Sequence, residues 1–66
     1  MTGSLTFYDE PSAWGLIMGE DDRVYVVRGS QVLGVPPRVG DKVRFEPDQQ
    51  GRGLRALAVR RTAEAR

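Results

Sequence analysis

Most apolar residues of this chain fall in five short runs, which glycine, proline and acidic residues separate from one another. The runs are rich in valine and aromatic residues, which is typical of β-strands. Adjacent prolines rule out a regular strand in the long connection from Gly29 to Val39. The sequence therefore predicts five strands, over Leu5–Tyr8, Trp14–Met18, Arg23–Arg28, Lys42–Glu46 and Leu54–Arg60.

Five short strands in so small a chain indicate an all-β barrel. A sequence of 66 residues forms one domain at most, near the lower limit for a core without a staple. Closing the sheet removes exposed strand edges, which would otherwise promote aggregation. The pattern alone fits both a five-stranded OB-type barrel and an SH3-like barrel. We expect the barrel domain to span residues 1–61, followed by a short charged tail over 62–66.

The sequence contains neither cysteine nor histidine. Disulfides, metal sites built from cysteine and histidine, and a histidine general base are therefore all excluded. The carboxylates are scattered among lysines and arginines, with no two placed on an obvious rigid element. We therefore expect no catalytic activity, no cofactor and no bound metal.

The formal net charge is +1, which argues against a strongly electrostatic duplex binder. It is compatible with a protein that binds mostly by stacking. No apolar run approaches the roughly 20 residues of a membrane span. The N-terminal residues lack the basic and apolar segments of a signal peptide. We expect a cytoplasmic location and no contact with a membrane.

The aromatic residues are concentrated in the first three predicted strands, which hold four of the five. If Ile17, Val24 and Val26 fill the barrel, alternation places the intervening residues outside. The predicted outer surface then consists of Trp14, Leu16, Tyr25 and Val27, next to Arg28. A bulge in the first strand would decide whether Phe7 or Tyr8 is the more exposed, and the sequence leaves that open.

An exposed aromatic patch usually marks a binding surface, because it is costly to leave in water. Unpaired bases stack on such rings, and each stack is worth about 1–3 kcal/mol. The alternative is that large rings in a small chain are simply core. In the fourth strand, alternation with charged residues places Val43 and Phe45 on one face, and we assign Phe45 to the core.

Five motifs follow one another along the chain, at Gly3–Asp9, Ser12–Ile17, Tyr25–Arg28, Gly40–Phe45 and Gly53–Val59. They resemble the motifs of the cold-shock domain, in which the first two read G-x-V-K-W-F-N and K-G-F-G-F-I at the same spacing. Tyr25–Arg28 stands where that family has F-V-H-F, and Gly40–Phe45 resembles G-x-x-V-x-F. The final G-P-x-A-x-x-V is matched at Gly53, Ala56 and Val59. The resemblance covers nearly the whole chain, from Gly3 to about Val59.

The resemblance implies an OB-fold barrel of five antiparallel strands that binds single-stranded RNA or DNA. Carried over by position, Phe7, Trp14 and Tyr25 are stacking platforms, and Tyr8 supports them. Arg52, just before Gly53, is a phosphate or base contact. The expected interface therefore comprises Phe7, Tyr8, Trp14, Leu16, Tyr25, Val27, Arg28 and Arg52.

The sequence departs from the cold-shock pattern mainly at ligand-bearing positions. Thr6 and Ser12 stand in place of lysines, Ala13 in place of glycine, and Leu54 in place of proline. Leu16 and Arg28 replace phenylalanines, and Val27 replaces histidine. We expect a binder of single strands with little sequence preference, acting as an RNA chaperone or a single-strand-binding accessory. The alternative is a protein-interaction module that uses the same patch or a sheet edge.

Overall fold

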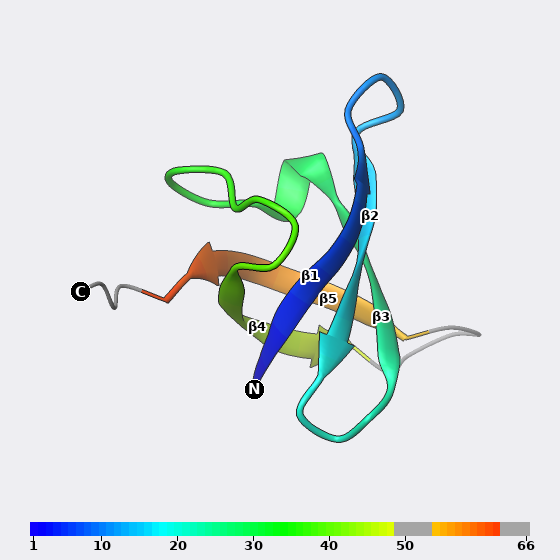
Figure 1. Cartoon of the computed structure of the whole chain (residues 1–66), viewed down its shortest axis with the longest axis vertical. Helices are drawn as coiled ribbons and strands as arrows, with labels where there is room; N and C mark the ends of the chain where they lie inside the picture. Colours follow the sequence, from blue (N-terminus) through cyan, green and yellow to red (C-terminus); the bar gives the residue numbers. More distant parts are fainter. Residues whose placement is uncertain (49–53, 63–66) are drawn as a thin grey trace.

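Five strands and one short 3-10 turn make up the regular structure of the described residues (Figure 1). The computed structural model describes residues 1–48 and 54–62. The elements are β1 (Thr2–Asp9), β2 (Trp14–Gly19), β3 (Val24–Arg28), η1 (Gly29–Gln31), β4 (Lys42–Asp48) and β5 (Arg55–Arg61). The five predicted strands are therefore confirmed, with β1 beginning three residues before Leu5 and β4 extending two residues past Glu46, to Asp48.

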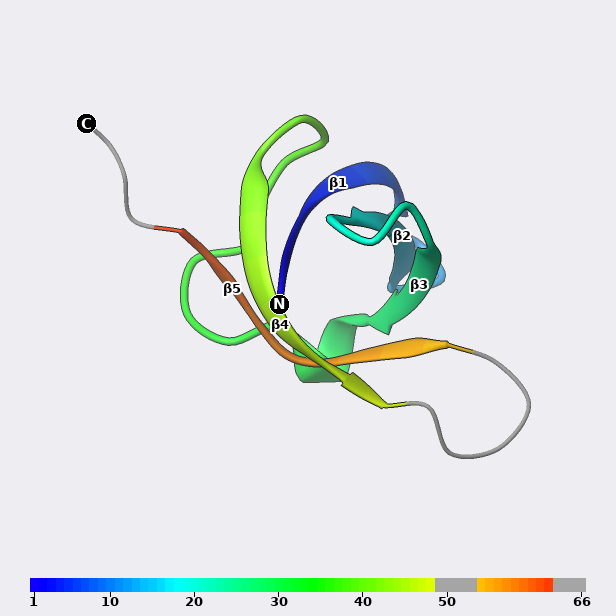
Figure 2. The ribbon, with the colours of Figure 1, turned by 90° about the horizontal axis from the view of Figure 1, so that it is seen from below.

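The strands form a closed barrel in the order β1-β2-β3-β5-β4, with β4 returning to β1. Figure 2 shows β1, β2 and β3 curving around one side while β4 and β5 cross the other. The pairings of β1 with β2, β2 with β3, β4 with β5 and β1 with β4 are antiparallel. The β3–β5 pairing is parallel, so the expectation of a wholly antiparallel barrel is wrong at this position. The reason is topological, because a closed ring with an odd number of strands cannot alternate direction at every pairing.

Among the residues that the structure describes, eight buried hydrophobic side chains fill the barrel: Leu5, Ile17, Tyr25, Val27, Val43, Phe45, Ala56 and Val59. The Tyr25 and Phe45 rings pack together in its interior, with centroids 4.9 Å apart and planes inclined at 58°. This inclined arrangement is favourable for aromatic pairs. Burial of Val43 and Phe45 confirms the face predicted for the fourth strand.

Two irregularities bend the barrel strands. The β1–β2 register shifts between Leu5 and Phe7, which leaves Thr6 as an extra residue. The β4–β5 register shifts near Ala58, whose φ of 52° lies in the left-handed region. Such bulges increase local twist and help a short sheet to close.

The connection from β3 to β4 lies beside one end of the barrel. Val32 forms an isolated bridge with Val59, and the Leu33 amide donates to the Val59 carbonyl over 2.8 Å. Near β4, the Gly40 amide donates to the Leu5 carbonyl over 2.8 Å. The connection is thus attached to both β5 and β1, and it forms one wall of a cleft described below.

Candidate nucleic-acid interface

The outer surface of β1, β2 and β3 consists of cross-strand rows. Phe7 lies opposite Leu16, which in turn lies opposite Val26. Trp14 lies between Asp9 and Arg28 in the neighbouring row. A third row joins Ser4, Met18 and Val24. Side chains directly opposite one another in a sheet share a face, so these rows form one surface. We call this surface the outer face, made of Phe7, Trp14, Leu16, Met18, Val24, Val26 and Arg28.

Phe7 and Trp14 form an exposed aromatic pair on the outer face. Their ring centroids lie 5.2 Å apart with an interplanar angle of 55°. The exposed fractions are 42% for Phe7 and 36% for Trp14, large for rings of this size. An inclined pair of rings is mutually favourable and still leaves ring surface accessible to a ligand.

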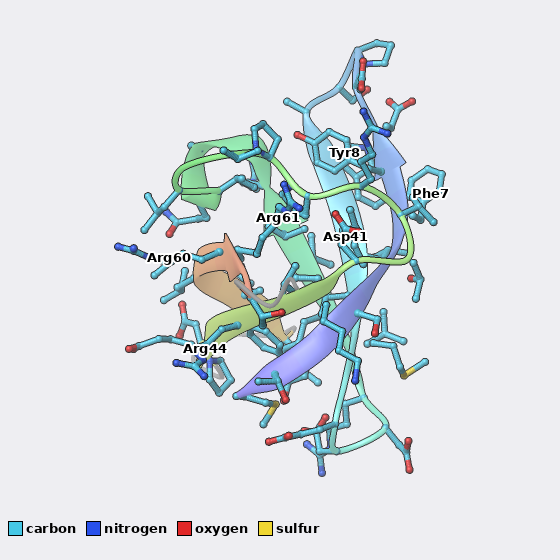
Figure 3. The ribbon with its side chains drawn as sticks, turned by 60° about the vertical axis from the view of Figure 1, so that its left-hand side comes forward. Phe7, Tyr8, Asp41, Arg44, Arg60 and Arg61 are labelled. Carbon is cyan, nitrogen blue, oxygen red and sulfur yellow. The ribbon has the colours of Figure 1, made fainter. Side chains whose placement is uncertain are left out.

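The β1 bulge explains why Phe7, rather than Tyr8, is on the outside. With regular alternation from buried Leu5, residue 7 would point into the barrel and residue 8 would point out. The extra residue at Thr6 reverses this phase, so Phe7 points outward and Tyr8 inward. Figure 3 shows the two side chains on opposite sides of β1. Tyr8 is half-buried against the core, close to its cross-strand neighbour Gly15, where a β-carbon would lie only 2.6 Å from Tyr8 Cδ1.

The predicted outward orientation of Tyr25 and Val27 is wrong. Their exposed fractions are 0% and 1%, whereas Val24 and Val26, predicted to be core, are 46% and 40% exposed. The register explains the error, because Tyr25 lies directly opposite Ile17 and must share its inward face. The buried phenol keeps a polar contact, since its hydroxyl donates to Asp21 Oδ2 over 2.7 Å.

Tyr8 and Val27 line a cleft instead of the outer face. The cleft has a volume of about 330 Å³ and lies between the barrel end and the β3–β4 connection. Val32, Pro36 and Pro37 contribute the wall on the side of the connection. Two residues of the expected interface are therefore turned toward a separate, largely apolar cavity.

The two predicted arginine contacts have different outcomes. Arg28 is exposed at the end of β3 and lies directly opposite Trp14, as an interface residue requires. Arg52 lies outside the described residues. Sequence reasoning missed Met18, Val24 and Val26 on the outer face, and the cross-strand register is the information that would have found them.

Comparison with protein-family models and with curated proteins gives no match. The closed five-stranded barrel is compatible with the cold-shock resemblance but does not by itself identify that family. Within residues 1–48 and 54–62, no cluster of three or more Asp and Glu side chains is arranged to hold a metal ion. In the same part of the chain, no helix has the length and apolar character needed to cross a bilayer.

Proposed function

We propose that the outer face binds single-stranded RNA or DNA with little sequence preference. The observation that carries this proposal is the exposed Phe7–Trp14 ring pair on adjacent strands. Unpaired bases stack on accessible rings whatever their identity, because every base has a π-face. The aliphatic side chains next to the pair carry no hydrogen-bond donor or acceptor, so they add contact area without reading base edges.

The charges on either side of Trp14 favour one placement of the strand. Arg28 and Asp9 lie opposite Trp14 on its two neighbouring strands. A phosphate is attracted to the guanidinium and repelled by the carboxylate. Bases stacked over Trp14 therefore have their backbone on the β3 side, next to Arg28.

Binding of this kind opposes secondary structure in the nucleic acid. A base that stacks on Phe7 or Trp14 leaves its stack with neighbouring bases, so the folded nucleic acid loses stability. The exchange needs no ATP and no catalytic residue. The domain would act as an RNA chaperone or as a single-strand-binding accessory.

Trp14 is the only tryptophan, so its fluorescence reports on the proposed interface without interference. The parent chain is titrated at low salt with oligothymidylate or oligouridylate of about 15 nucleotides, which have no stable secondary structure. We expect quenching and a spectral shift that saturate with added strand. Phe7→Ala should weaken binding while leaving the Trp14 signal observable. Unchanged fluorescence with both oligonucleotides, supported by unchanged anisotropy of a labelled strand, would overturn the proposal.

Protein binding is the second candidate, and exposed aliphatic residues favour it. Val24 and Val26 cover the β3 part of the outer face, and Leu33, Val35 and Val39 are exposed on the β3–β4 connection. Aliphatic side chains lack the π-system that base stacking uses, but they suit apolar protein contacts. An outer face that ignores oligonucleotides would make this candidate the better one.

A further inference from the structure

Two arginines face each other on the β4–β5 side of the barrel. Arg44 on β4 is the direct cross-strand partner of Arg60 on β5, and both side chains are exposed. Figure 3 shows both arginines on the opposite side of the barrel from Phe7. Lys42 follows the same outward alternation as Arg44 along β4. We call Lys42, Arg44 and Arg60 the arginine surface.

The Arg44–Arg60 arrangement is electrostatically unfavourable for the protein alone. Side chains directly opposite on an antiparallel pair have β-carbons about 4.5–5.5 Å apart, and like charges there are destabilising. The neighbouring pairs differ, since Arg55 lies opposite Asp48, and Arg61 forms an ion pair with Asp41 over 3.6 Å. Within the described residues, neither Arg44 nor Arg60 forms an ion pair with a carboxylate.

The nearby acidic groups compensate the pair only in part. Thr2 lies opposite Arg44 on β1, and its hydroxyl donates to Glu20 Oε1 over 2.8 Å. Glu46 lies two residues beyond Arg44 on β4, where its cross-strand partner is Leu57. Neither carboxylate lies opposite the two guanidiniums, so an external anion is the natural complement for both.

We infer that the arginine surface is a second nucleic-acid contact, which binds the phosphodiester backbone and not the bases. It offers no exposed ring on which a base could stack, and guanidiniums bind phosphate oxygens in a bidentate manner. A net charge of +1 gives little long-range attraction, so the contact is local and weak. Because Phe7 and this surface lie on opposite sides, one domain can hold a strand by its bases and another segment by its backbone.

A DNA duplex tests the arginine surface separately from the outer face, because its bases are paired and unavailable for stacking. The full chain is titrated with a labelled blunt duplex of about 20 base pairs, at about 20 mM salt, where phosphate contacts are strongest. We expect Arg44→Ala/Arg60→Ala to weaken duplex binding at least tenfold. The slope of log affinity against log salt should fall by about 1.8, which corresponds to two lost phosphate contacts. Trp14→Ala should bind the duplex like the parent.

The matched control is Arg23→Ala/Arg55→Ala, which removes the same charge from arginines that lie beside carboxylates. It should retain most of the duplex affinity, and Arg44→Lys/Arg60→Lys should lose only part of it. The urea midpoint of Arg44→Ala/Arg60→Ala should equal or exceed that of the parent, because a repulsive pair has been removed. A parent chain that does not bind the duplex overturns the inference, as does equal weakening in the control. Neither result affects the single-strand titration, so the two proposals fail independently.

Discussion

The ring of Phe7 lies 5.2 Å from the ring of Trp14, inclined by 55°, with both rings exposed on adjacent strands. An exposed pair of this kind contributes modestly to folding, because each ring keeps much of its contact with water. The pair itself is worth about 0.5–1.5 kcal/mol beyond its buried area. Part of each ring remains accessible in the folded protein, and a ligand that stacks on the pair would bury that surface.

We predict that Trp14→Ala weakens single-strand binding by about 1–3 kcal/mol, the worth of one base–ring stack. Unfolding free energy should fall by less than it does for a core ring, because the Trp14 side chain keeps 36% of its surface exposed in the folded protein. Phe45→Ala is the control for a core ring, with an expected stability loss of about 3–5 kcal/mol. Urea unfolding followed by circular dichroism and the anisotropy of a labelled oligonucleotide measure the two effects. A core-sized stability loss in Trp14→Ala would show that this ring is structural.

The hydrogen bond from Tyr25 to Asp21 predicts a pH effect. It holds the pKa of the Asp21 carboxyl below its ordinary value of 3.8. Because the folded-state pKa is lowered, the stabilisation is fully present above the unfolded-state pKa. It is lost as pH falls through the folded-state pKa. Tyr25→Phe should return the Asp21 pKa toward its ordinary value, measured by NMR titration of the carboxyl carbon. An Asp21 pKa that does not respond to Tyr25→Phe would contradict this assignment.

The positive φ of Ala13, 56°, predicts that a glycine would stabilise the β1–β2 turn. A left-handed conformation costs a non-glycine residue about 1–2 kcal/mol. Glycine avoids this cost, but it loses about 0.5–1 kcal/mol because its unfolded chain has more conformational entropy. Ala13→Gly should therefore raise the unfolding free energy by up to about 1 kcal/mol, and Ala58→Gly should do likewise. Ala56→Gly, in a buried strand position with no positive φ, should lower it. Urea midpoints measure all three, and a clear loss in Ala13→Gly would count against strain at that residue.

Ala13 also links the structure to the sequence resemblance. It occupies the position at which the cold-shock motif has its first glycine, and the backbone there has the conformation that favours glycine. The local geometry is therefore compatible with the motif although the residue is not. With no family match, the resemblance stays a prediction.

Strand positions were predictable from the sequence, but the facing of β3 was not. Lys42, Arg44 and Glu46 mark the outward side of β4, so the alternation placed Val43 and Phe45 correctly. In β3, by contrast, Val24 and Val26 on one side and Tyr25 and Val27 on the other are all apolar. When both faces of a strand are apolar, alternation alone cannot show which face points into the barrel. In β3, only the pairing with β2 determines it.

The sequence predicted the orientation of a site residue where its neighbours along the strand indicate it. It did not where the orientation depends on how two strands pair. Trp14, Leu16 and Arg28 lie on the outer face as expected, because Ile17 sets the phase of β2 and Arg28 ends β3. Whether Phe7 or Tyr8 points outward depends on a one-residue bulge at Thr6, and a threonine at that position does not by itself indicate a bulge. The like-charged Arg44–Arg60 pair depends on a register between two strands and has no signature in the sequence alone.

Leu16 occupies the centre of the row that joins Phe7 to Val26. Leucine can cover a base face by apolar contact but has no π-system on which a base could stack. The same holds for its cross-strand neighbour Val26. Each missing base–ring stack costs about 1–3 kcal/mol, although neighbouring losses do not add fully. We therefore expect the parent chain to bind single strands weakly. The expected dissociation constant is on the order of micromolar or above, which corresponds to a binding free energy of about −8 kcal/mol or less favourable.

Leu16→Phe should tighten single-strand binding by up to about 1–3 kcal/mol, because it places a third ring beside Phe7 and Trp14. The control is Leu33→Phe, which adds the same ring to an exposed position on the β3–β4 connection, away from the three strands of the outer face. It should leave the affinity for oligothymidylate unchanged. Arg28→Ala, measured in the same series, should flatten the salt dependence by about 0.7, the value for one phosphate contact on a single strand. If Leu16→Phe folds like the parent and gains no affinity while the parent binds, bases do not stack at position 16. If neither chain binds any single strand at low salt, the outer face is better assigned to a protein partner.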